Sequence, residues 1–296
     1  MPARVAAMQL LMRAESPEAA QSALLRACAA SGRTGAEHLQ SLHGLLAEHP
    51  RAWAMVRDIL ARVQHRQEAG DPVTRWAALF DEAVRISPEG SVALYSLGSP
   101  RLLALATHEV VSALSQWGLL GRERTVLDIG CGIGRLEAAL SPLSAAVIGI
   151  DVSPGMIARA RTRCADFPNV RLLLGSGHDL ADIADASVDL ALLVDSFPYI
   201  FLSEGQLAER CFAEISRVLR PGADAVLLNF SYRDDVAADC RDLERLAEPR
   251  GMSLVSVAER PCASWDAPGF HLIKRRPRPG AGNETQVTML PTAGEA

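Results

Sequence analysis

The stretch VLDIGCGIGR, which begins at Val126, constrains the fold more than any other part of the chain. Residues 125–129 form a short apolar and β-branched run of the kind that fills a strand covered on both faces. Three glycines at alternate positions follow it: Gly130, Gly132 and Gly134. Glycine lets the backbone turn at positive φ and lets a ligand approach the main chain. Residues 135–140 then fit a helix, so the stretch predicts a strand, a turn and a helix with a small-molecule site at the turn.

The spacing of the glycines, and the acid in front of them, favour an amino acid derivative over a dinucleotide. In the dinucleotide fingerprint the third glycine comes three positions after the second, whereas Gly134 comes two positions after Gly132. Asp128 stands ahead of the first glycine, where a carboxylate repels a pyrophosphate and attracts an ammonium group. We therefore expect a ligand that carries an amino group.

A second apolar run, residues 146–150, supplies the other half of this predicted site. It ends at Asp151, which lies 21 residues beyond Gly130 (151 minus 130). An acid at this place typically accepts hydrogen bonds from the two hydroxyls of a ribose. Ser153, followed by a proline, is a helix start signal, and the flexible thioether of Met156 suits contact with a flat base.

Three segments together resemble the class I S-adenosylmethionine-dependent methyltransferases: DIGCGIG, GIDVSPGMIARAR and RVLRPGADAVLLNF. The resemblance covers roughly residues 97–274. It implies S-adenosyl-L-methionine as the cofactor, with Asp128 on the methionine ammonium, Asp151 on the ribose and Met156 on the adenine. Neighbouring positions of the same motifs are expected to contact the cofactor as well: Gly130, Cys131, Gly132 and Val152.

The third predicted strand, residues 170–174, departs from the family pattern just after it ends. The family often has an acid after the next glycine that reaches the adenine amine, but Ser176 stands there. Either Ser176 or Asp179 is the candidate for this cofactor contact. His178 between them is a candidate general base, because its ordinary pKa suits proton transfer near neutral pH. The alternative is a loop histidine with no chemical role.

Two further strands end in residues that could meet a substrate. Residues 188–194 lead into DSFPY, and residues 225–230 lead to Tyr232, both at the carboxyl edge where open α/β sheets bind ligands. The candidate catalytic residues are His178, Asp195, Tyr199 and Tyr232, with Asp195 also a cofactor candidate, and the sequence does not choose the base among them. The candidate substrate-binding residues are Tyr95, Phe197, Tyr199 and Tyr232, with ordinary packing as the alternative for Tyr95. SFPY resembles the [DNS]PP[YF] motif of amino-group methyltransferases only in part, so N-methylation is not inferred.

The resemblance and the periodicity of apolar residues together predict a two-part α/β protein. Residues 1–118 read as helices, and we expect them to act as a substrate cap, a lid or an oligomerisation region. Residues 119–275 are expected to form the cofactor-binding domain, a Rossmann-like seven-stranded mostly parallel sheet with helices on both faces. Strands at residues 253–259 and 270–274 form its closing antiparallel hairpin, and the proline-rich residues 276–296 are expected to be disordered.

Composition excludes several other classes of protein. The net charge of −5 and the pI of about 5.8 give no overall attraction to nucleic acid. The six cysteines include no CxxC pair, and three N-terminal histidines lack partners of metal-ligand spacing, so we expect neither a disulfide nor a bound metal. No apolar run is long enough to span a membrane, and Gln9 and Arg13 interrupt the N-terminal apolar stretch too early for a secretory signal. We therefore expect a cytoplasmic protein.

Three functions remain compatible with the sequence. The first is methyl transfer to a small molecule, such as a natural product or another secondary metabolite. The second keeps the cofactor but acts on a protein or an RNA, with residues 1–70 as a docking module. The third is a relative that uses the bound sulfonium without transferring its methyl group. Pairing of two copies through the helical N-terminal region is also an expectation.

Overall fold

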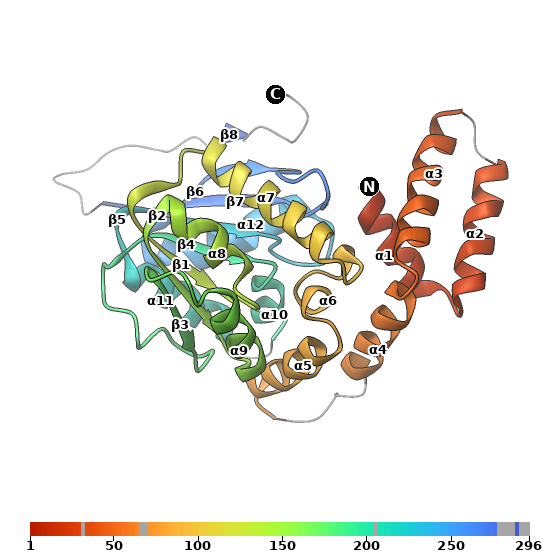
Figure 1. Ribbon diagram of the computed structural model, residues 1–296. Helices are drawn as coiled ribbons and strands as arrows, with labels where there is room; N and C mark the ends of the chain where they lie inside the picture. The colour runs from red at the N-terminus through yellow and green to blue at the C-terminus, as the bar shows by residue number, and fades with distance from the viewer. Residues whose placement is uncertain (31–32, 65–69, 204–205, 277–287, 290–296) are drawn as a thin grey trace.

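The computed structural model describes residues 1–30, 33–64, 70–203, 206–276 and 288–289 (Figure 1). Within them, the segments that precede the sheet are helical, as predicted: α1 (Ala3–Arg13), α2 (Pro17–Ala30), α3 (Arg33–Glu48), α4 (Ala52–Gln64), α5 (Pro72–Ile86), α6 (Pro88–Val92), the short η1 (Leu94–Ser96) and α7 (Pro100–Gln116). Asp71 begins α5, because its side chain accepts a hydrogen bond from the Thr74 N–H at 2.9 Å and a proline follows it.

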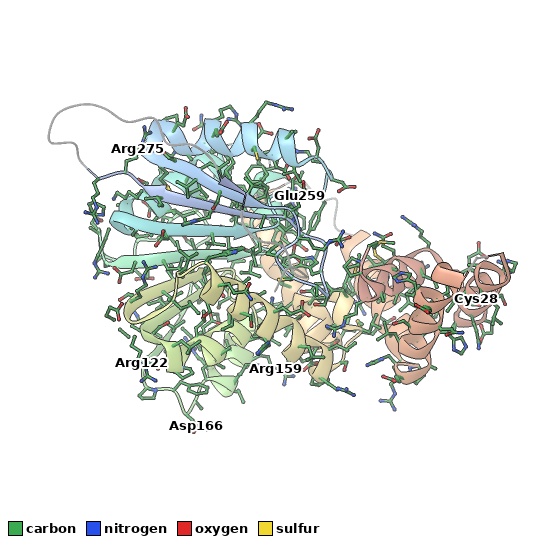
Figure 2. All side chains as sticks on the ribbon, turned by 90° about the horizontal axis from the view of Figure 1, so that it is seen from above. Cys28, Arg122, Arg159, Asp166, Glu259 and Arg275 are labelled. Atoms are coloured by element: carbon green, nitrogen blue, oxygen red, sulfur yellow. The ribbon has the colours of Figure 1, made fainter. Side chains whose placement is uncertain are left out.

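Helices α1 to α4 pack around a small core that also includes Leu97 and, from α7, Leu102. Leu11, Leu42 and Val56 are buried at its centre, and the Trp53 indole N–H donates to the Ala14 carbonyl at 3.2 Å. Figure 1 shows these helices to one side of the sheet, with α5 and α6 between them and the rest of the molecule. The view in Figure 2, with Cys28 at the far end of this region, shows how far the helices extend from the strands.

The sheet contains the seven predicted strands: β1 (Gly121–Ile129), β2 (Ser144–Asp151), β3 (Val170–Leu174), β4 (Val188–Val194), β5 (Leu219–Leu228), β6 (Met252–Ala258) and β7 (Gly269–Lys274). Their order is β3-β2-β1-β4-β5-β7-β6, parallel from β3 to β5 and antiparallel where β7 pairs with β5 and β6. The order reverses between β1 and β4, and open α/β sheets bind ligands at such a reversal.

Two sequence predictions about strands need correction. The fifth strand begins at Leu219 rather than at residue 225, because a shift of register between Val188 and Leu190 of β4 accommodates the Arg-Pro-Gly sequence. Thr288–Met289 forms a short strand, β8, beside β6, although residues 276–296 were expected to be disordered. Residues 277–287 and 290–296 lie outside the described part of the chain.

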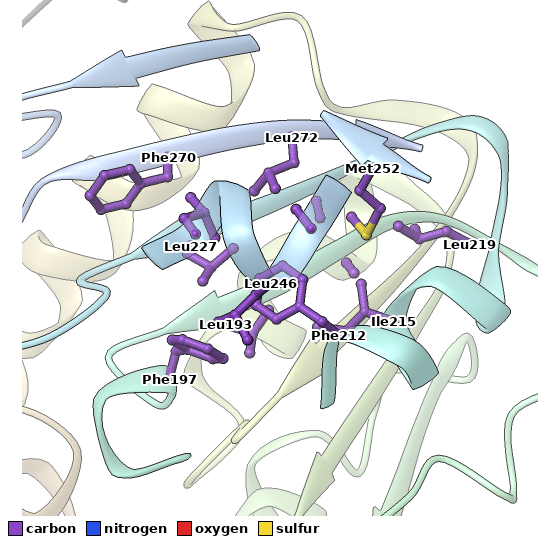
Figure 3. Packing of buried hydrophobic residues seen from close by; sticks show 14 of the residues in the cluster. Leu193, Phe197, Phe212, Ile215, Leu219, Leu227, Leu246, Met252, Phe270 and Leu272 are labelled. Carbon is purple, nitrogen blue, oxygen red and sulfur yellow. The ribbon is translucent and has the colours of Figure 1, made fainter. Parts of the chain in front are cut away.

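Helices cover both faces of the sheet, as the unbroken apolar runs of the central strands predict. One face packs against α10 (Phe197–Phe201), α11 (Leu207–Val218) and α12 (Val236–Ala247), and the other against α7, α8 (Arg135–Leu140) and α9 (Pro154–Arg163). The short helices η2 (Ser141–Leu143) and η3 (Glu248–Arg250) follow α8 and α12. On the first face, Figure 3 shows Phe212 and Leu246 pointing toward Leu193 and Leu227 of the sheet.

Replacing Phe212 by alanine tests this packing. The side chain is fully buried, and its ring centroid lies 5.5 Å from that of Phe197. The free energy of unfolding should fall by about 3–5 kcal/mol in urea denaturation, because the change removes a large apolar side chain and leaves a cavity. Leu174→Ala is the control, since Leu174 is half exposed and should cost no more than about 0.5 kcal/mol. Equal effects of the two changes would contradict the packing described.

Candidate functional site

A cavity lies where β1, β2 and β4 end, and α5 and α6 contribute part of its wall. The glycine turn after β1 forms its floor and has no room for side chains. Gly130 has a φ of +83°, and a Cβ atom there would lie 2.4 Å from the Ser196 Cβ. At Gly132, with a φ of +54°, it would lie 2.6 Å from a methyl group of Val92. The backbone at this turn is therefore close to both neighbouring segments, as glycine alone permits.

Asp151 connects this turn to the helix that follows β2. Its Oδ2 accepts a hydrogen bond from the Gly132 N–H, and its Oδ1 accepts one from the Ser153 N–H, each at 2.9 Å. Burial raises the pKa of this carboxyl, although these N–H donors act in the opposite direction. Asp151 lines the cavity, so the acid predicted at the end of the second strand is placed beside the glycine turn.

Asp128 and Glu137 are two buried acids beside the turn. Asp128 is 2% exposed and Glu137 is not exposed at all, and the two carboxyls interact with each other, whereas no other described residue gives the Asp128 Oδ1 or either Glu137 oxygen a hydrogen bond. Burial raises the pKa of Asp128 to about 6, against the effects of Glu137 and Arg135. Burial and the nearby Asp128 charge raise the pKa of Glu137 well above its ordinary value. Burial therefore disfavours ionisation of both acids, and more strongly at Glu137 than at Asp128.

Arg135, the first residue of α8, brings a buried positive charge to the same cavity. It is 8% exposed and lines the cavity. Its guanidinium donates one hydrogen bond, to the Thr107 hydroxyl at 3.2 Å. Within the described part of the chain, no carboxylate lies within ion-pair distance of it. Buried charges are normally paired, so this guanidinium has the capacity to bind an anion.

Asp195 follows β4 at the opposite end of the cavity from Asp151 and is held in a strained backbone conformation. Its φ is +60°, and Asn229, which follows β5, has a φ of +69°. The Asp195 Oδ1 accepts hydrogen bonds from the Asn229 amide at 2.8 Å and from the Tyr232 hydroxyl at 3.1 Å. Burial raises the pKa of Asp195 to about 6, while these donors and Arg135 act to lower it. Such strain in non-glycine residues gathers at functional sites.

Aromatic rings from two separate helices form the wall next to Asp195. Trp76 and Phe80 of α5 lie edge-to-face on Tyr199 of α10, with ring centroids 5.0 and 5.1 Å apart. These three rings, which line the cavity, are named here the aromatic wall. The ring of Tyr232 lies 6.1 Å from that of Tyr199.

Asp81 attaches α5, and with it the aromatic wall, to the start of α9. Its Oδ1 accepts hydrogen bonds from the Gly155 N–H at 2.8 Å and from the Ser153 hydroxyl. A Cβ at Gly155 would lie 2.9 Å from this carboxylate, so the small residue permits the contact. The Ser153 hydroxyl also accepts from the Met156 N–H, which makes Ser153 the N-cap of α9 as predicted.

Most of the residues predicted for the site line this one cavity: Asp128, Gly130, Cys131, Gly132, Asp151, Val152, Met156, His178, Asp179, Asp195 and Tyr199. His178 is partly exposed, and its Nε2 lies 3.4 Å from the Asp71 carboxylate. Tyr232 reaches the site through its hydrogen bond to Asp195 rather than by lining the cavity.

Three predicted residues lie elsewhere. Tyr95 is buried, its ring stacks on Trp265 at 5.7 Å, and it packs in the core without lining the cavity. Phe197 is fully buried against the Phe230 ring, at 5.0 Å, because its helix turns it away from the cavity into the core. Ser176 is exposed, and its hydroxyl donates to Asp179 within its own loop. Of the two alternatives for the adenine contact, only Asp179 lines the cavity.

Arg135, Glu137 and the rings of α5 were missed by the sequence analysis. The Arg that follows the glycines looked like an ordinary first helical residue, and Glu137 looked like a favourable acid in a first turn. Trp76 and Phe80 stand four residues apart on a predicted helix, which is the spacing of a packing face. A signal existed only for Arg135, because it directly follows the glycine motif.

Comparison with known proteins identifies the domain around this cavity. Residues 127–227 match the family model described as a methyltransferase domain, and this range includes the glycine turn, Asp151 and Asp195. These residues form a class I S-adenosylmethionine-dependent methyltransferase domain. The match begins within β1 and ends within β5, so it covers the parallel half of the sheet that surrounds the cavity.

Two curated relatives resemble the methyltransferase domain and its surroundings. A demethylmenaquinone methyltransferase of Tropheryma whipplei (strain Twist) is 37% identical over 132 residues, which are 44% of this chain and 52% of that protein. One of Parafrankia sp. (strain EAN1pec) is 30% identical over 171 residues, 52% of this chain and 62% of that protein. The chain thus spans about half the length of the first of these relatives. A crystal structure of an S-adenosylmethionine-dependent methyltransferase from Aquifex aeolicus covers 70% of this chain and 100% of its own, with 21% identity and a TM-score of 0.47.

Other features of the described residues concern metals, thiols and membranes. No group of three or more histidine, cysteine or acidic side chains in the described ranges is placed to hold a metal ion. All six cysteines are free. None of the helices that the structure describes has both the length and the apolar character needed to span a bilayer.

Asp128 should make the stability of the ligand-free protein depend on pH. Its folded-state pKa of about 6 lies above its ordinary value of 3.8, so it stabilises the fold below pH 4 and this stabilisation is lost as pH rises through 6. Asp128→Asn never ionises. The unfolding free energy of the variant minus that of the wild type, measured in urea, should therefore increase by roughly 1 kcal/mol from pH 5 to pH 7.5. Asp166→Asn, at an exposed aspartate, should show no such increase. A difference that stays constant for Asp128→Asn would contradict the burial of a charge there.

Proposed function

We propose that the protein transfers the methyl group of S-adenosylmethionine to a small molecule. The observation that carries the proposal is the set of three charged side chains in one cavity, Asp128, Arg135 and Asp151, spaced along a glycine turn and the end of the next strand. Each matches a different part of this cofactor. The proposal covers the activity of the whole protein, whereas the family match covers residues 127–227.

The first two charges suit the methionine end of the cofactor. An α-amino acid carries an ammonium and a carboxylate next to each other. Asp128 lines the cavity, and its carboxylate would accept from the ammonium. Arg135, buried with one hydrogen bond to Thr107, would donate to the carboxylate. One zwitterion would pair with both buried charges and so offset the hydration that each charge loses on burial. The cavity therefore favours this ligand over one without the amino acid.

The remaining contacts suit the nucleoside end. Asp151 lines the cavity beside the turn, where the ribose is expected, and Met156 is buried on the wall formed by α9. Asp179 lines the same end and is the candidate for the adenine amine. Val73 of α5 contributes an apolar surface there, so the base would be covered by the N-terminal helices as well as by the sheet domain.

When bound, the cofactor supplies a methyl group on a sulfonium, which already carries its own leaving group. The residues of the chain then have mainly to hold the acceptor in line with the methyl carbon and to exclude water. Orientation of this kind contributes about 7–11 kcal/mol in favourable cases. The apolar and aromatic side chains of α5 and α10 provide both functions at the Asp195 end of the cavity.

A small-molecule acceptor is supported by the way in which the cavity is covered. Trp76 and Phe80 of α5 lie over its β4 end, which leaves the site better suited to a compact molecule than to a chain of nucleotides. The net charge of −5 gives no attraction to RNA. Two of the relatives are named demethylmenaquinone methyltransferases, which also act by name on a small molecule. A natural product or another secondary metabolite is accordingly proposed as the substrate.

Calorimetric titration with two related ligands tests this function. The wild-type protein should bind S-adenosylmethionine tightly and 5′-methylthioadenosine, which lacks the amino acid, more weakly. Arg135→Met should weaken binding of S-adenosylmethionine about tenfold or more, because a charge-assisted hydrogen bond is lost, and should leave 5′-methylthioadenosine unchanged. Asp128→Asn should also weaken binding of S-adenosylmethionine and leave 5′-methylthioadenosine unchanged, because the charged acceptor for the ammonium is lost.

The controls separate a structural effect from a binding effect. Asp166→Asn should bind both ligands like the wild type, and NAD should not bind to any form. Equal weakening of both ligands by Arg135→Met would mean that Arg135 only supports the fold. A folded wild-type protein that binds neither ligand would refute the cofactor. Formation of S-adenosylhomocysteine with an accepted substrate would establish that the methyl group is transferred.

A further inference from the structure

The β4 end of the cavity is separate from the residues assigned to the cofactor. Asp128 and Asp151 come from the ends of β1 and β2, whereas Asp195 and the aromatic wall lie at and beyond the end of β4. Because β1 lies between β2 and β4, the cavity runs from the nucleoside end, past the methionine end, to Asp195. An acceptor must approach the methyl group from the side that the cofactor leaves open, and this inference rests on the function proposed above.

Asp195 presents one carboxylate oxygen that the protein does not use. Its Oδ1 already accepts from Asn229 and Tyr232. For Oδ2, the described residues provide no hydrogen-bond donor, and Asp195 lines the cavity. The positive φ angles of both Asp195 and Asn229 hold this carboxylate in place at a cost in backbone energy. A carboxylate fixed on one oxygen and free on the other is arranged to accept a hydrogen bond from a ligand.

The aromatic wall beside Asp195 has its own polar groups largely satisfied. The Trp76 indole N–H donates to the Ser203 hydroxyl at 3.1 Å, and that hydroxyl donates to the Tyr199 carbonyl at 2.6 Å. The neighbouring Ser196 hydroxyl donates to the Ile129 carbonyl. The Tyr199 hydroxyl interacts with Tyr232. A molecule at this end therefore meets ring surfaces, this hydroxyl and one free carboxylate oxygen. This combination fits a flat, apolar body that carries a hydrogen-bond donor.

The charge of the cofactor decides which kind of donor fits. An ammonium group would be attracted to Asp195, but it would have to lie beside the sulfonium, and two like charges repel strongly in a site closed to water. A neutral hydroxyl avoids this repulsion. Once it has given up its proton it is negatively charged, and the sulfonium attracts it. An aromatic hydroxyl is acidic enough for a carboxylate to assist the loss of its proton during the transfer.

We propose that Asp195 and the aromatic wall form the acceptor subsite, and that the acceptor is an aromatic molecule whose hydroxyl is the nucleophile. Asp195 Oδ2 accepts the hydroxyl proton while the hydroxyl oxygen forms its bond to the methyl carbon. The bond between that carbon and sulfur breaks, and its electron pair stays on sulfur. The products are the methyl ether, S-adenosylhomocysteine and the protonated Asp195, which returns its proton to water. Tyr232 and Asn229 act as positioning residues, because they fix the other oxygen of the carboxylate.

Binding of three naphthalene probes tests the subsite without a turnover assay. The probes are 2-naphthol, 2-methoxynaphthalene, which lacks the donor, and 2-naphthylmethylamine, which is a cation. Each is titrated calorimetrically into the protein alone and with S-adenosylhomocysteine present. The wild type should bind 2-naphthol about tenfold more tightly than 2-methoxynaphthalene, and Asp195→Asn should reduce this ratio to about one, because the charged acceptor is lost. Asp166→Asn should keep the ratio of the wild type.

A second variant distinguishes the contribution of the aromatic wall to probe binding from that of the Asp195 carboxylate. Trp76→Ala, on a helix outside the sheet, should weaken 2-naphthol and 2-methoxynaphthalene about equally and preserve their ratio. A ratio near one in the wild type, or a ratio that survives Asp195→Asn, would overturn the role of Asp195. Tighter binding of the amine than of 2-naphthol would overturn the hydroxyl assignment. Absence of binding by every probe would overturn the aromatic subsite. Because the titrations are also made without a nucleoside, these outcomes remain distinct from a failure to bind S-adenosylmethionine.

Discussion

The Asp81 carboxylate joins the two parts of the molecule at the point on which the cavity depends. It receives the Gly155 N–H and the Ser153 hydroxyl at the start of α9. The Ser153 N–H donates to Asp151, and Asp151 accepts from the Gly132 N–H. A continuous series of hydrogen bonds therefore runs from a helix of the N-terminal region to the glycine turn. Together with the hydrogen bond from Trp76 to Ser203, this series attaches α5 to the sheet domain and helps to hold Trp76 and Phe80 over the strand ends.

The charges at the site explain why such an attachment matters. Asp128 and Arg135 are nearly fully buried beside Glu137, whose own ionisation is disfavoured by burial, and few protein groups satisfy them. Buried charges of this kind cost stability, and the apolar packing on both faces of the sheet has to offset that cost. Asp128 and Arg135 form no ion pair with each other, so both remain available to the proposed zwitterion. Stability and binding therefore make opposite demands on these residues, as is common at functional sites.

How much could be predicted from the sequence depends on how far apart the interacting residues are. The strands, the glycine turn, Asp128 and Asp151 follow from patterns within about 30 residues, and the structure has them where they were expected. Tyr95 and Phe197 lie outside the cavity, and the sequence could not show this because their environment is set by Trp265 and Phe230, which come from other segments. The contact of Asp81 with Ser153 spans 72 positions in the chain. No local pattern of charge or hydrophobicity distinguishes such an acid from an ordinary surface residue.

The two ends of the cavity are built from different kinds of segment. This difference separates the residues proposed for cofactor binding, which the fold positions, from those proposed for acceptor specificity, which can vary. The end with Asp128 and Asp151 lies on neighbouring parallel strands whose geometry the fold dictates. The end with Asp195 combines a strained residue after β4, a short helix, and α5 from the helical region. Changes in α5 can therefore alter the wall that meets an acceptor while the glycine turn keeps its shape. Specificity for the acceptor should accordingly reside in Trp76, Phe80 and Tyr199, whereas the requirement for the cofactor resides in the strands.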